Sequence, residues 1–216
     1  MDKRAFTLAE VLITLGVIGV ISAMTLPTII KHYQKQVTVT RLKKAYSELY
    51  QAVNMSVSEN TGVENWDYTL TGDEFFDKYL KPYIKSGKSN RKRTFSSYNG
   101  VTYEIYTHND FTEIIVDING NKKPNLLGKD IFIFHVFSKK KDFYNNGNGN
   151  IAQNIPVGGL YPDGYGYTRK AMKNDTWRGC NRRNDKSAKG YGIQAGAFCT
   201  ALIMLDGWKI EDDYLW

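Results

Sequence analysis

Histidine and cysteine are scarce in this chain of 216 residues, which has three of the first and two of the second. The three histidines, His32, His108 and His135, are far apart in the sequence, and His135 lies in an apolar run where a structural histidine is more common than a base. The chain also lacks a nucleophile motif, a Walker loop and a dinucleotide fingerprint. These absences speak against the corresponding classes of enzyme, and we predict that the protein is not an enzyme.

Charge is absent from one long stretch near the N-terminus. Between Arg4 and Lys31 the one ionisable side chain is Glu10, so residues 11–30 are uncharged. A helix needs about 20 such residues, each rising about 1.5 Å, to cross the hydrocarbon core of a bilayer. Residues 6–30 are therefore predicted to form a membrane-spanning helix.

Glu10 is the exception within this apolar segment. A carboxylate at hydrocarbon depth is costly and is by default functional, with a partner of opposite charge. The basic residues of the short leader, residues 1–5, favour a cytoplasmic N-terminus. A cut between Ala5 and Phe6 would create an α-amino group that supplies the missing cation, either close to Glu10 or in a neighbouring copy of the protein.

The segment KRAFTLAE, followed by an apolar helix with Pro27 near its far end, resembles the N-terminus of type IV prepilins and type II secretion pseudopilins. The resemblance implies that a membrane peptidase cuts before Phe6 and methylates its new amine. It also implies that Glu10 pairs with the amine of an adjacent subunit during filament assembly. The family usually has glycine where this chain has Ala5. Pro27 removes a backbone donor and is the predicted kink of the helix.

The same resemblance implies partners and a location. The implied partners are other pilin or pseudopilin subunits, the prepilin peptidase and the inner-membrane assembly platform. The implied location is the bacterial inner membrane, with the N-terminus in the cytoplasm and the C-terminal domain outside, and then a pilus or pseudopilus. Two alternatives need no filament: the apolar segment could be a secretory signal peptide, or a single-pass anchor in which Glu10 is incidental.

Cysteine occurs twice, at Cys180 and Cys199. With a cytoplasmic N-terminus, the chain after Ile30 lies outside the inner membrane, where disulfides persist. We predict that the two cysteines are bonded, which stabilises the fold by roughly 3 kcal/mol in the chain-entropy model. The alternatives are two free buried thiols or a metal pair, for which the clustered Cys and His spacing of zinc sites is missing.

Glycine and proline are absent from residues 31–61. Apolar residues recur there at steps of three and four, as they do on one face of an amphipathic helix, so the membrane helix is predicted to continue to about Asn60. Lys43, Lys44 and Glu48 fall away from the apolar face. The residues of that face are Val39, Leu42, Tyr46, Leu49, Val53 and Val57.

The periodicity changes after residue 100. Three runs rich in β-branched and aromatic residues, Val101–Thr107, Phe111–Ile118 and Ile131–Phe137, predict three antiparallel strands. The predicted fold is α+β and pilin-like. A long N-terminal helix, with a membrane half and an amphipathic half, packs on a small antiparallel sheet, and a disulfide ties the C-terminal region.

Two shorter signals complete the prediction of structure. Thr71 and Glu74 have the spacing of a capping box in front of a short helix. Asp206 and Gly207 form a turn signal between two apolar runs, which predicts a β-hairpin.

The loop between the second and third predicted strands is rich in oxygen-bearing side chains. Calcium takes roughly six to eight oxygen ligands from carboxylates, amide carbonyls and backbone, so this loop is a candidate calcium site. It resembles strand-connecting loops of secretion pseudopilins, some of which bind calcium. The alternative is a plain hydrogen-bonded turn. The candidate ligands are Asp117, Asn119, Asn121, Asn125 and Asp130.

Residues 161–191 interleave tyrosine and tryptophan with basic side chains. Aromatic platforms among cations are used in sequence-tolerant binding of single-stranded nucleic acid, and the resembled family includes DNA-uptake pili. The other interpretation is that these tyrosines serve in packing and subunit contacts. The candidate nucleic-acid-binding residues are Arg169, Lys170, Arg178, Arg182 and Arg183.

Together these signals predict a leader at residues 1–5, a transmembrane and assembly helix at residues 6–30, and an extracytoplasmic globular domain at residues 31–216. The predicted function is that of a structural subunit, a minor pilin or pseudopilin. The alternative is a membrane-anchored extracytoplasmic protein that never polymerises and holds a ligand such as DNA on its basic, tyrosine-rich surface.

Overall fold

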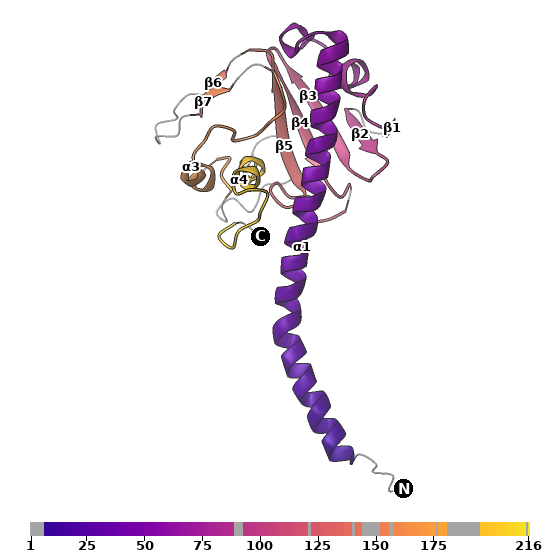
Figure 1. Cartoon of the computed structure of the whole chain (residues 1–216), viewed down its shortest axis with the longest axis vertical. Coiled ribbons are helices and arrows are strands. Elements are labelled where there is room, and N and C mark those ends of the chain that lie inside the picture. The colour runs from indigo at the N-terminus through magenta and orange to yellow at the C-terminus, as the bar shows by residue number, and fades with distance from the viewer. Residues whose placement is uncertain are drawn as a thin grey trace. The chain divides into compact units, whose positions relative to one another are not determined.

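The computed structural model describes residues 7–88, 93–120, 122–139, 141–143, 152–155, 158–175, 177–180, 195–214 and 216. The chain divides into two compact units, Met1–Val37 and Thr38–Trp216. Helix α1, Leu8–Asn60, makes up the described part of the first unit apart from Thr7 and continues into the second (Figure 1). The predicted long N-terminal helix is therefore confirmed.

A six-stranded antiparallel sheet forms the centre of the second unit, with the spatial order β1-β2-β3-β4-β5-β8. The three predicted strands correspond to β3, β4 and β5, which pair over their full lengths. The sheet is larger than predicted because shorter strands extend it on both sides. Its strands are β1 (Ser86–Lys88), β2 (Thr94–Ser97), β3 (Thr102–His108), β4 (Phe111–Asp117), β5 (Ile131–Phe137) and β8 (Tyr161–Pro162).

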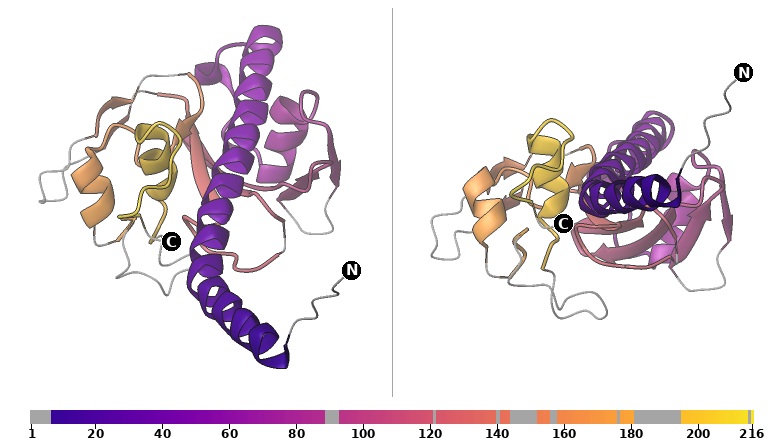
Figure 2. Two further views of the ribbon diagram at one scale, coloured as in Figure 1. Left: turned by 60° about the horizontal axis from the view of Figure 1, so that its bottom comes forward. Right: turned by 90° about the horizontal axis from the view of Figure 1, so that it is seen from below.

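One face of this sheet is buried by the part of α1 that belongs to the second unit (Figure 2). Leu42 and Leu49 of α1 are fully buried in one core with Ile114 and Phe134. The ring of Tyr46 lies 5.6 Å from that of Phe134. Burying each such side chain stabilises the fold by roughly 1.5–3 kcal/mol relative to its exposure, so the predicted apolar face of the helix is what holds it on the sheet.

Short helices cover the same core beyond the end of α1. They are η1 (Val63–Asn65), α2 (Gly72–Phe75) and η2 (Phe76–Leu80). The predicted capping box is present: Glu74 N–H donates to Thr71 Oγ1 at 3.4 Å, and Thr71 N–H donates to Glu74 Oε2 at 2.9 Å. The ring of Phe76 then stacks on that of Phe95 in β2, with centroids 3.6 Å apart.

The predicted hairpin around Asp206 and Gly207 is wrong. The first apolar run forms helix α4 (Cys199–Leu205), and Gly207 ends it with a φ of 72°. Gly207 N–H donates to the Met204 carbonyl, and Trp208 N–H donates to the Ile203 carbonyl, which is the Schellman pattern of a helix C-terminus. A glycine after an apolar run fits both structures, and the helix form buries the first five residues of the run, Cys199 to Ile203.

Three further elements lie in the C-terminal half of the chain. Helix α3 (Arg169–Asn174) begins at Thr168, whose side chain accepts a hydrogen bond from Ala171 N–H. Strands β6 (Lys141–Phe143) and β7 (Ala152–Ile155) form a separate two-stranded sheet.

Candidate functional site

The N-terminus of α1 is closed by a second capping box, made by Thr7 and Glu10. Glu10 Oε2 accepts hydrogen bonds from Thr7 N–H and Thr7 Oγ1, both at 2.8 Å, while Glu10 N–H donates to Thr7 Oγ1 at 3.3 Å. The carboxylate that the sequence singles out therefore has a local partner within its own chain. The predicted cleavage residues, Ala5 and Phe6, lie outside the described residues.

The apolar part of α1 carries large hydrophobic side chains that are exposed along the whole stretch from Leu8 to Ile30. In the described part of the chain, α1 is the one helix that is long and apolar enough to cross a membrane. Two of its hydroxyl groups bond within the helix: Thr14 Oγ1 donates to the Glu10 carbonyl and Thr25 Oγ1 to the Ile21 carbonyl, each at 2.9 Å. Such internal bonding is what a hydrocarbon environment requires.

Pro27 lies inside α1. Because proline has no N–H, the carbonyl of Ala23 lacks its usual partner four residues on. The role of Pro27 as the kink of the helix stays a prediction.

The loop between β4 and β5 is closed around the carboxylate of Asp130, which is 3% exposed. Asp130 Oδ2 accepts from Asn119 Nδ2 at 3.0 Å and from Asn125 N–H at 2.8 Å, and Oδ1 accepts from Leu126 N–H at 2.7 Å. Asn125 has a φ of 53°, the left-handed conformation that asparagine tolerates. Hydrogen bonds thus hold this loop in one conformation.

Asp117 faces the same loop at the end of β4. Its Oδ1 accepts from Asn119 N–H at 3.0 Å. Burial, with a contribution from the negative charge of Asp130, raises the pKa of Asp117 to about 6 despite that hydrogen bond. The side-chain oxygen of Asn119 is buried and has no hydrogen-bond partner among the described residues. Asn121, the remaining candidate ligand, lies outside the described residues.

The disulfide between Cys180 and Cys199 is formed, with Cα atoms 4.9 Å apart, which confirms the predicted pairing. Cys199 is the first residue of α4, so the bond ties this helix to the segment after α3. The β4–β5 loop lies directly against it. A methyl group on Gly128 would come within 2.5 Å of Cys199 Sγ, and Tyr214 Oη donates to the Gly128 carbonyl at 2.7 Å.

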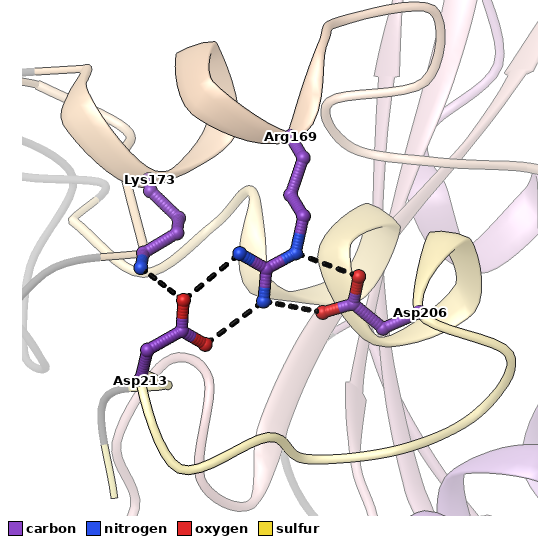
Figure 3. A network of polar contacts seen from close by, with 4 residues as sticks. All are labelled: Arg169, Lys173, Asp206 and Asp213. Carbon is purple, nitrogen blue, oxygen red and sulfur yellow. Dashed lines mark hydrogen bonds and ion pairs between the residues drawn. The ribbon is translucent and has the colours of Figure 1, made fainter.

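An ion-pair network joins α3, the end of α4 and the C-terminal segment (Figure 3). Arg169 donates to both oxygens of Asp206, at 2.8 and 3.0 Å, and to both oxygens of Asp213, at 2.9 and 2.8 Å. Lys173 also pairs with Asp213. The hydrogen bonds from Arg169 and then Lys173 hold the pKa of Asp213 well below its usual range.

The predicted nucleic-acid-binding residues therefore differ in whether their charges are already paired within the fold. Arg169 is committed to Asp206 and Asp213, and Arg178 is paired with the buried carboxylate of Asp163. The side chain of Lys170 is exposed. Arg182 and Arg183 lie outside the described residues. Nucleic-acid binding stays a prediction that nothing in these contacts tests.

His135 of β5 is buried and lies directly opposite Glu113 of β4. The distance from Nε2 to Glu113 Oε2 is 3.4 Å. Burial raises the pKa of Glu113, but the hydrogen bond and charge of His135, together with the charges of Arg178 and His108, outweigh it, so this pKa lies below its ordinary value. The histidine thus has the environment of a structural residue.

Glu48 makes contacts that the sequence did not predict. It was predicted only to lie away from the apolar face of α1; it is half-buried, and its carboxylate accepts hydrogen bonds from Ser97 Oγ at 2.9 Å, Asn99 Nδ2 at 3.0 Å and Tyr103 Oη at 3.0 Å. It anchors α1 to the β2–β3 hairpin. The helical period placed it beside Lys44, and no sequence signal marks its three partners.

Two sequence families match this chain. Residues 28–215 match the family described as "Family of unknown function (DUF6613)", which is most of the chain. The chain belongs to this family. In this DUF6613 protein, residues 1–26 match the "Prokaryotic N-terminal methylation motif", so its N-terminus is of the prepilin type. Neither a curated protein nor a solved structure matches the chain.

The motif and the fold together make this a type IV pilin-like or pseudopilin-like protein. An α+β unit with a long N-terminal helix and a disulfide-tied C-terminal region agrees with that assignment. It is consistent with membrane anchoring and with contact to other pilin subunits and a prepilin peptidase. No group of three or more His, Cys, Asp or Glu side chains suited to a metal occurs among the described residues.

Proposed function

We propose that this protein is a structural subunit, a minor pilin or pseudopilin, of a type IV pilus or a type II secretion pseudopilus. In this proposal the peptidase cuts between Ala5 and Phe6 and methylates Phe6. The apolar helix stores the subunit in the inner membrane until it joins a bundle of similar helices, with the assembly platform as its partner there. The observation that carries the proposal is the Thr7–Glu10 pair at the start of an exposed apolar helix within a methylation motif.

Glu10 has the central role in this mechanism. In the single chain its charge is satisfied by two donors from Thr7, so the carboxylate is accommodated before assembly. Cleavage creates an amine that competes for it. Exchange of the neutral Thr7 donors for a cation adds a direct attraction between opposite charges, which is strong at low dielectric. The pairing with a neighbouring subunit would then favour docking.

Replacement of the charge tests this role. Glu10→Gln should be cleaved and methylated normally but should fail to enter filaments, measured by immunoblot of sheared filaments against the membrane fraction. Thr14→Val is the matched control, since the Thr14 hydroxyl bonds only to carbonyls of its own helix among the described contacts. A Glu10→Gln subunit that enters filaments like the parent protein would contradict the role and favour a permanent membrane anchor.

We further propose that the β4–β5 loop binds calcium. The supporting observation is the buried side-chain oxygen of Asn119, which has no partner among the described residues. The two nitrogens of Asn119 bond to Asp117 and Asp130, so two carboxylates lie close to this residue. Asp117 and Asn119 would hold the ion, with Asp130 already occupied by three donors. A calcium titration that leaves the thermal midpoint of the full chain unchanged would remove this proposal and leave the hydrogen-bonded turn.

A further inference from the structure

A groove of about 730 Å³ runs along the outer side of α1 in the second unit. Its floor is the helix surface between Val39 and Gln51. One wall is Asn99 in the turn between β2 and β3, and the other is Trp208 after α4. A groove of this length on a helix presents an extended surface to a partner, whereas a small ligand would need an enclosed pocket.

Both walls of the groove are held in place by contacts already formed within the chain. Asn99 donates to Glu48, and the Schellman pattern after α4 fixes the backbone of Trp208. The Trp208 ring lies 5.4 Å from that of Tyr46, and Lys43 Nζ lies 5.9 Å from its centroid. A preformed wall with a tryptophan is typical of an energetic centre of a protein interface.

The floor of the groove is basic. Lys43 and Lys44 are exposed there, and Arg41 is exposed one helical turn before Lys44. The one carboxylate in the lining, Glu48, accepts three hydrogen bonds from the fold. The groove therefore favours an acidic partner.

An acidic surface that would complement the basic groove occurs on the same chain, at the C-terminal end of α1. Residues 59–77 contain six acidic residues and no basic one. They lie between the last turn of α1 and the start of η2. At about 1.5 Å per residue, the end of α1 at Asn60 is about 24 Å along the helix from Lys44. Figure 1 shows this end of α1 on the side of the second unit away from the N-terminus. These residues are Glu59, Glu64, Asp67, Asp73, Glu74 and Asp77. Glu59, Glu64, Glu74 and Asp77 are exposed, and Asp77 is paired with Lys81 at 2.8 Å, so Glu59 and Glu64 are the exposed carboxylates that we assign to the contact.

We propose that the groove receives the acidic end of a second copy of this chain, in a head-to-tail contact. The formal net charge of the whole chain is +7, so an acidic end on a basic protein is a distinctive complement to the groove. A contact between two different surfaces of one subunit leaves both surfaces open at the ends, so it propagates into a filament instead of closing as a dimer. This inference rests on the proposed function, because assembly is what brings copies side by side.

Cysteine cross-linking tests the contact directly. The two native cysteines are bonded to each other, so introduced cysteines supply the free thiols. The variant Lys44→Cys with Glu64→Cys should give a ladder of disulfide-linked copies when assembled filaments are oxidised, and each single variant should not. Lys85→Cys with Glu64→Cys is the control, because Lys85 is exposed but lies outside the groove.

Charge reversal gives an independent measure. Lys43→Glu with Lys44→Glu should lower incorporation into filaments by about tenfold, since like charges brought together at an interface are repelled. Adding Glu59→Lys and Glu64→Lys to the same chain should restore it. Assembled filaments of the Lys44→Cys with Glu64→Cys variant that give no ladder on oxidation, or a reversal variant that assembles normally, would overturn the head-to-tail contact while leaving the proposed function intact.

Two other results of the cross-linking and incorporation experiments can be distinguished from those above. A Lys44→Cys cross-link to a different subunit would overturn the assignment of a second copy as the occupant. Failure of the wild-type chain to enter any filament would overturn the proposed function itself.

Discussion

Gly128 lies against the sulfur of Cys199, so close that a Cβ atom on Gly128 would be 2.5 Å from Cys199 Sγ. Gly196 makes the same kind of approach from the other side, since its Cβ would be 2.7 Å from the Leu127 carbonyl oxygen. The β4–β5 loop and the disulfide are therefore packed into one structural unit at two positions where only glycine fits. This close packing depends on the absence of a Cβ atom at Gly128 and at Gly196.

The first prediction concerns Gly128. Gly128→Ala should lower the free energy of unfolding by more than about 2 kcal/mol, because a φ of 79° costs an L-residue about 1 kcal/mol and the disulfide must also shift. Thermal unfolding of the full chain in detergent measures it. Gly100→Ala is the matched control: its φ is 85°, but its Cβ would meet nothing within 4 Å. Equal losses in the two variants would contradict the packing argument.

The second prediction concerns the disulfide itself. Cys180→Ser with Cys199→Ser should cost about 3 kcal/mol of stability, as expected for a bond that closes a chain segment with a sequence separation of 19. Trypsin should then cut preferentially after the basic residues near α3. A double variant as stable as the parent protein would show that α4 is held by packing alone.

The third prediction follows from the raised pKa of Asp117. Because this pKa is about 6 in the folded protein against about 3.9 in an unfolded chain, its contribution to stability is full below about pH 4 and is lost as the pH rises through 6. Asp117→Asn keeps an acceptor for Asn119 N–H and removes the buried charge. At pH 8 it should raise the free energy of unfolding by about 1 kcal/mol after allowance for solvent screening, which corresponds to a rise of about 2–4 °C in the midpoint of thermal unfolding.

The same variant also tests calcium. Asp117→Asn should abolish any rise in the thermal midpoint that calcium produces in the parent protein. A calcium response that persists in the variant would place the ion elsewhere. A midpoint that falls at pH 8 without calcium would contradict the raised pKa.

The fourth prediction concerns the network around Arg169. Arg169→Gln should lower stability by about 1 kcal/mol at pH 7, because two carboxylates lose their bidentate partner. Since the lowered pKa of Asp213 contributes stability that is lost as the pH falls through it, the variant should also show a shallower loss of stability in acid. Lys170→Gln removes a neighbouring exposed charge and should leave both properties unchanged.

The long regular elements could be predicted from the sequence because their signals are local. The step of three and four residues along α1 and the β-branched runs of β3, β4 and β5 each specify one structure. Helix α4 could not, since Asp206-Gly207 serves equally as a hairpin turn and as a helix end. The three partners of Glu48 come from about 50 residues further along the chain, and only the folded sheet brings them together.

The candidate sites likewise contain features with a local sequence signal and features that depend on tertiary contacts. The pairing of Cys180 with Cys199 was predictable from their number and compartment. Glu10 stands out in the sequence because it is isolated in an apolar run, and its role in assembly is our proposal. The local partner of Glu10, Thr7, also has a sequence signal, the capping-box spacing that was recognised at Thr71 and Glu74 but not here. The ion pairs of Arg169 and Arg178 depend on tertiary contacts, so their basic character alone could not show that they are occupied.

The most direct test of the central claim is the intact mass and N-terminal sequence of the protein isolated from its native membrane. We predict a chain that begins at Phe6 and is about 14 Da heavier than the unmodified chain, the increment of one methylation. A chain that still begins at Met1 would contradict it and indicate a permanent anchor. A chain that begins near Met24 would also contradict it, because Glu10 would then be lost with a signal peptide.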